Sequence, residues 1–62
     1  MKTLKSILKA MNFEGHISLR RKIFRDIVYI GGGCSQDIID RFGGYKVDSM
    51  NVIDSVLIIY VN

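Results

Sequence analysis

The chain has 62 residues, of which nine are Lys or Arg, six are Asp or Glu, one is Cys and none is Pro. This length predicts one small domain over residues 1–62, and a domain of this size buries only about 60% of its unfolded surface. The lone Cys34 excludes an internal disulfide, and Cys34 with His16 supplies too few ligands for a structural zinc site. A hydrophobic share of 48% argues against intrinsic disorder.

The first predicted element is an amphipathic helix from Thr3 to about Met11. Its apolar residues recur at the i, i+3, i+4 and i+7 spacing of a helix face, and Thr3 can cap its first turn. A turn over residues 12–15 follows, from which Phe13 can fold back onto the core.

A second helix is predicted from Leu19 to about Ile30, with Ser18 as its N-cap and Gly31-Gly32-Gly33 as its end. Its apolar stripe has a helical period and leaves the basic residues on the opposite face. The competing interpretation is a strand, because residues 27–30 are β-branched or aromatic. The helical period over twelve residues favours the helix.

A third, short helix is predicted over residues 36–42, capped by Ser35 and ended by Gly43-Gly44. The last segment begins at Asp48 or Ser49 and is apolar on nearly every side, which is typical of a buried element. A helix is favoured for its first half, whereas residues 55–61 fit a helix or a strand. The expected fold is therefore mostly α, a compact bundle of three to four short helices, with a strand as the alternative for the C-terminal segment.

Neither a membrane span nor a signal peptide is expected. The longest unbroken apolar run, Val56 to Val61, is far shorter than the roughly 20 residues that a spanning helix needs. Lys5 and Lys9 interrupt the hydrophobic region that a secretory signal requires. The expected compartment is the reducing cytoplasm of a bacterium or of an infected host cell.

Candidate catalytic groups are few. The run Gly31-Gly32-Gly33-Cys34-Ser35 precedes a helix, but its spacing matches no phosphate-binding loop, so a flexible connector is favoured. Cys34 and His16 could form a nucleophilic pair, yet 62 residues leave little room for a substrate cleft. We therefore expect no enzyme, no metal site and no cofactor.

The charge is distributed unevenly along the chain. Residues 1–30 contain seven cations and two anions, whereas residues 31–62 contain two cations and four anions. Such asymmetry indicates either a face for an acidic partner or attraction between the two halves. The candidate partner-binding residues are the cations of the second predicted helix, with the N-terminal lysines steering encounter: Arg20, Arg21, Lys22, Arg25, Lys2, Lys5 and Lys9.

These features favour a small regulator or inhibitor, of the kind that viruses and mobile elements encode, which docks on an acidic protein through the basic helix. The alternative is a helix-turn-helix DNA-binding regulator, but its recognition segment would carry Asp48 and Asp54 and no cation. A third hypothesis is a helical homodimer that buries Val56 to Val61.

Overall fold

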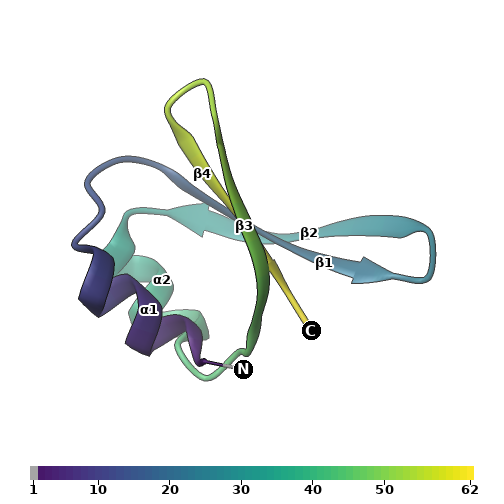
Figure 1. The fold of residues 1–62 in the computed structure, drawn as a ribbon, viewed down its shortest axis with the longest axis horizontal. Helices are drawn as coiled ribbons and strands as arrows, with labels where there is room; N and C mark the ends of the chain where they lie inside the picture. Colours follow the sequence, from purple (N-terminus) through teal and green to yellow (C-terminus); the bar gives the residue numbers. More distant parts are fainter. Residues whose placement is uncertain (1) are drawn as a thin grey trace.

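The computed structural model describes residues 2–62 and contains two helices and one four-stranded sheet (Figure 1). The predicted helical bundle is therefore wrong, and the fold is mixed α/β. The elements, in chain order, are α1 (Leu4–Met11), β1 (Ile17–Ile23), β2 (Asp26–Gly33), α2 (Ser35–Phe42), β3 (Val47–Ile53) and β4 (Val56–Val61).

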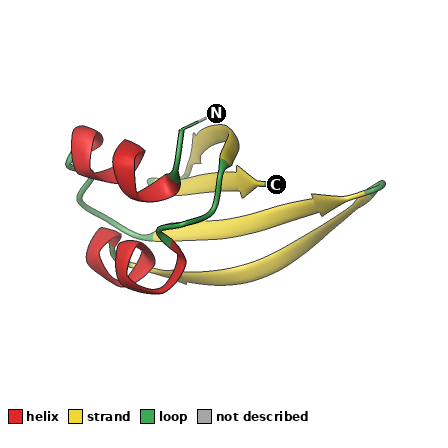
Figure 2. Cartoon of the chain, turned by 90° about the horizontal axis from the view of Figure 1, so that it is seen from below, coloured by secondary structure: helices red, strands yellow, loops and turns green. Residues whose placement is uncertain are grey.

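The sheet has the strand order β2-β1-β4-β3. Its two central strands, β1 and β4, are parallel, and each is joined to an edge strand by an antiparallel hairpin. The helices lie at one side of the molecule, and the β1–β2 hairpin runs well beyond them (Figure 2). The sheet thus has one face covered by helices, called here the inner face, and an opposite outer face.

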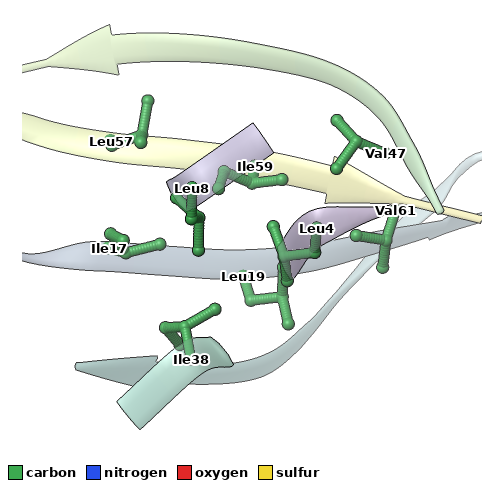
Figure 3. Close-up of a cluster of buried hydrophobic side chains, with 9 residues drawn as sticks. All are labelled: Leu4, Leu8, Ile17, Leu19, Ile38, Val47, Leu57, Ile59 and Val61. Carbon is green, nitrogen blue, oxygen red and sulfur yellow. The ribbon is translucent and has the colours of Figure 1, made fainter. Parts of the chain in front are cut away.

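The core lies between the helices and the inner face of β1 and β4. Side chains alternate across a strand, so every second residue of each central strand points toward the helices. Figure 3 shows these side chains meeting Leu4 and Leu8 of α1 and Ile38 of α2. The central strands contribute Ile17, Leu19, Leu57, Ile59 and Val61 to this cluster, each at most 2% exposed, and β3 adds Val47 at 8%.

The predictions of α1 and α2 are confirmed. The Thr3 hydroxyl caps α1 by accepting from the Ser6 backbone N–H, and Phe13 packs against the core. Cys34, not Ser35, is the N-cap residue of α2, and its side chain forms no cap bond. The Ser35 hydroxyl instead donates to the Phe13 carbonyl at 2.7 Å, which ties the start of α2 to the loop after α1.

The predicted helix from Leu19 to Ile30 is wrong, because this stretch forms the β1–β2 hairpin. The hairpin reverses in two residues, Phe24 and Arg25, and Phe24 has a positive φ of 57°. The β-branched and aromatic residues 27–30 belong to β2, as the competing interpretation had it. The three glycines continue β2 and do not end a helix.

The predicted helix from Asp48 or Ser49 is also wrong, because this segment is β3. The strand alternative for residues 55–61 is correct, since β4 covers Val56–Val61. With both of these segments in strands, the helices required for a helix-turn-helix are absent from the described residues. The homodimer hypothesis takes Val56–Val61 as helical, whereas this segment is strand β4, which β1 and β3 flank inside the sheet.

We expect Gly33→Ala to destabilise the fold and Gly44→Ala to leave it nearly unchanged. Gly33 ends β2 at a φ of +149°, which an L side chain rarely adopts, so the substitution costs about 1–3 kcal/mol of unfolding free energy. A Cβ added at Gly44 would meet nothing within 4 Å. Urea unfolding of both variants measures the difference, and equal midpoints would contradict this account.

Candidate binding surface

The four cations predicted to share one helix face lie on a strand and its turn, so they point in different directions. Arg20 pairs with Tyr60 in the β1–β4 register, and the alternation of β1 puts Arg20 and Lys22 on the outer face. Arg21 pairs with Val61 and therefore points to the inner side. Arg25 occupies the turn. The prediction that these four cations share one side of a helix is wrong.

The outer face combines cations with tyrosines. Arg20 pairs with Tyr29 of β2 and with Tyr60 of β4, and its Nε donates to the Ser18 hydroxyl at 3.3 Å. The Lys22 Nζ lies 5.0 Å from the centroid of the Tyr60 ring, a cation–π distance. These contacts hold the two cations above the sheet.

Residues 22–29, called here the ribbon, form the end of the β1–β2 hairpin, most of which extends beyond the rest of the sheet. The β1–β4 register ends at Arg21 and Val61, so past this point β1 pairs only with β2 (Figures 1 and 2). The ribbon exposes Phe24 completely and Tyr29 by 61%, together with Ile23, Ile27 and Val28. A two-stranded ribbon with exposed apolar residues is marginally stable alone in water. Its composition indicates a contact surface.

Among residues 2–62, no carboxylate forms an ion pair with the cations of β1 and its turn. In the part of the chain from residue 2 to residue 62, their side-chain interactions are the Arg20–Ser18 hydrogen bond and the Lys22–Tyr60 contact. The hypothesis that the basic and acidic halves attract each other within the fold therefore gains no support at this hairpin. These positive charges remain available to a partner.

The N-terminal lysines do not join the outer face. Lys5 and Lys9 are exposed on α1, in the helical layer, and the Lys2 carbonyl accepts from the Val47 N–H at the start of β3. The seven predicted residues thus form two separate basic groups, and Arg20, Lys22 and Arg25 follow one hairpin.

Sequence reasoning missed the aromatic residues of this surface. Phe24 lies within the predicted second helix and Tyr60 within the predicted buried segment, whereas in the structure Phe24 is fully exposed and Tyr60 lies on the outer face. The β-branched and aromatic run over residues 27–30, which favours a strand, is the signal that leads toward this surface.

Cys34, a candidate catalytic residue, lies at the start of α2 as its N-cap residue. Cys34 is an exposed free thiol, and no three His, Cys, Asp or Glu side chains of residues 2–62 gather as a metal site would require.

A shallow, open depression is lined by Arg41, Phe42, Gly44 and Tyr45. None of the helices in residues 2–62 has the length and apolarity that crossing a bilayer demands.

Comparison with known proteins finds no matching family model, no similar curated protein and no similar solved structure. The surface is therefore interpreted from its own chemistry.

Proposed function

We propose that this chain is a non-enzymatic binding protein, a small regulator or inhibitor, that docks on an acidic protein through the outer face and the ribbon. One observation carries the proposal. The β1–β2 hairpin combines a completely exposed Phe24 with four cations that have no carboxylate partner within the described part of the chain. Arg and aromatic side chains contribute most of the free energy in protein interfaces.

The aliphatic side chains favour a protein partner over a nucleic acid. Surfaces for single-stranded nucleic acid rely on cations and aromatic rings, on which bases stack. The ribbon also exposes Ile23, Ile27 and Val28, each by more than 40%. Such residues match the apolar centre of a protein interface, with the cations as its rim. The free thiol of Cys34 fits action in a reducing cytoplasm, bacterial or of an infected host.

The test compares two charge-reversed variants. Arg20→Glu/Lys22→Glu alters the outer face, and Lys5→Glu/Lys9→Glu makes the same charge change in the helical layer. The probe is the protein captured by the tagged chain from its native host, identified by mass spectrometry, purified and titrated by calorimetry. We expect the first variant to lose at least about tenfold in affinity and the second to change mainly the association rate.

Two further arms separate the other classes of partner. The chain is titrated with a single-stranded oligonucleotide and with vesicles containing anionic lipid at physiological salt. Binding to either, with loss in the Arg20→Glu/Lys22→Glu variant and no acidic protein captured, would contradict the proposal. Equal affinity of both charge-reversed variants for the captured protein would contradict the assignment of the surface.

A further inference from the structure

The two edge strands of the sheet, β3 and β2, differ in how far other contacts occupy their outward-facing backbone groups. Edge β3 is partly covered: the Val47 N–H donates to the Lys2 carbonyl, and Thr3 forms a bridge with Lys46. Farther along β3, the Asn51 side chain accepts from the Val52 N–H at 3.0 Å. These contacts occupy backbone groups that would otherwise be free to pair with another strand.

Edge β2 has no such cover among the described residues. Every backbone hydrogen bond found outside the helices and the sheet ladders leaves Asp26–Gly33 untouched. Residues 27–33 contain no charge and no Pro, the usual devices that prevent edge pairing. One device is present, a bulge at Ile30, which leaves Asp26–Tyr29 as the regular part of the edge.

We infer that the β2 edge pairs with the β2 edge of a second copy of this chain, giving a two-fold symmetric dimer with a continuous eight-stranded sheet. Antiparallel pairing centred on Val28 places Ile27 opposite Tyr29 of the second copy on the outer face, and Val28 opposite Val28 on the inner side. This pairing brings apolar side chains of the two ribbons side by side on both faces of the sheet, in a region that the chain's own helices do not reach (Figure 2).

The charge of β2 favours β2 of a second copy, and not an acidic segment, as the strand that pairs with this edge. The only charged residue of β2 is Asp26, an anion, so an acidic strand would gain no ion pair at this edge. An uncharged apolar strand fits better, and β2 itself is such a strand. Self-pairing therefore leaves the cations of β1 free for the acidic partner.

Repulsion between the basic strands of the two copies does not prevent this dimer. The two β1 strands would be three strand spacings apart, about 14 Å. Exposed charges at that separation are largely screened, because the Debye length is about 8 Å at physiological ionic strength.

Analytical ultracentrifugation of the purified chain, without any partner, tests the inference. Across ~10 µM to ~1 mM protein, we expect the sedimenting mass to rise to twice that of one chain. Val28→Lys should remain a monomer at every concentration, because two lysines would lie opposite each other across the two-fold axis. Its circular dichroism spectrum should match that of the unsubstituted chain.

The control is Val52→Lys, which places the same side chain on the covered edge β3. Val28 and Val52 are both exposed valines of edge strands, pairing with Arg21 and Leu57, and both lie on the inner side. Val52→Lys should dimerise like the unsubstituted chain. A monomer at all concentrations, or a dimer that Val28→Lys leaves intact, would overturn the inference. If Val28→Lys unfolds, amide hydrogen exchange of the unsubstituted chain tests the inference instead. The protection of the backbone amides of residues 27–29 must then rise with protein concentration.

Discussion

Ile59→Ala is expected to remove most of the folded population. Ile59 is fully buried in the central strand β4, where it pairs with Leu19 of β1 and Met50 of β3. Truncation of a buried Ile to Ala costs about 2–5 kcal/mol, and a domain below 70 residues rarely has more than about 3–5 kcal/mol of stability. Thermal unfolding followed by circular dichroism should show a melting transition that is strongly lowered or lost.

Val52→Ala is the matched control for this prediction. Val52 lies on the same side of the neighbouring strand but is 57% exposed, so its truncation leaves little cavity. Its cost should stay below about 1 kcal/mol, the span of strand propensities. Similar melting temperatures for the two variants would show that the helices and β4 do not share one core.

The two helices could be predicted because their local signals agree with their tertiary setting. In α1, the i, i+4 pair Leu4 and Leu8 is buried, and Thr3 caps the first turn as its side chain predicts. In α2, Ile38 is buried and Gly43 is the C-cap residue. In α1 the periodicity and the N-cap agree, and in α2 the periodicity and the terminal glycine agree.

The hairpins could not be predicted because their turns lack the usual residues. Tight two-residue turns favour Gly or Asn at positions of positive φ, yet here Phe24, Asp54 and Ser55 adopt it. Without those markers, residues 19–30 form one amphipathic pattern that no turn signal interrupts. The spacing of Leu19, Ile23 and Ile27 fits a helix face, although the β-branched run after the turn favoured a strand.

The candidate surface was predictable in its composition and not in its geometry. The cations of residues 20–25 were identified from the sequence. A strand, however, sends successive side chains to opposite faces, so Arg20 and Lys22 separate from Arg21. The pairing of Arg20 with Tyr29 and Tyr60 depends on the register of three strands, which only the assembled sheet determines.

Phe24→Gly is expected to weaken binding of the proposed partner by at least about 30-fold while leaving the fold intact. Phe24 is completely exposed, so its ring contributes no packing within the chain. A hot-spot aromatic residue contributes about 2 kcal/mol or more to binding, which corresponds to this loss. Calorimetric titration of the acidic partner against both chains measures the change.

The stability of Phe24→Gly should equal or exceed that of the unsubstituted chain. At the φ of 57°, a residue with a side chain is strained by about 1–2 kcal/mol, which Gly avoids, although Gly also raises the entropy of the unfolded chain. Contact with the proposed partner would give this exposed ring in a strained turn a function. Unchanged affinity together with raised stability would remove Phe24 from the binding surface and leave its conformation without a functional reason.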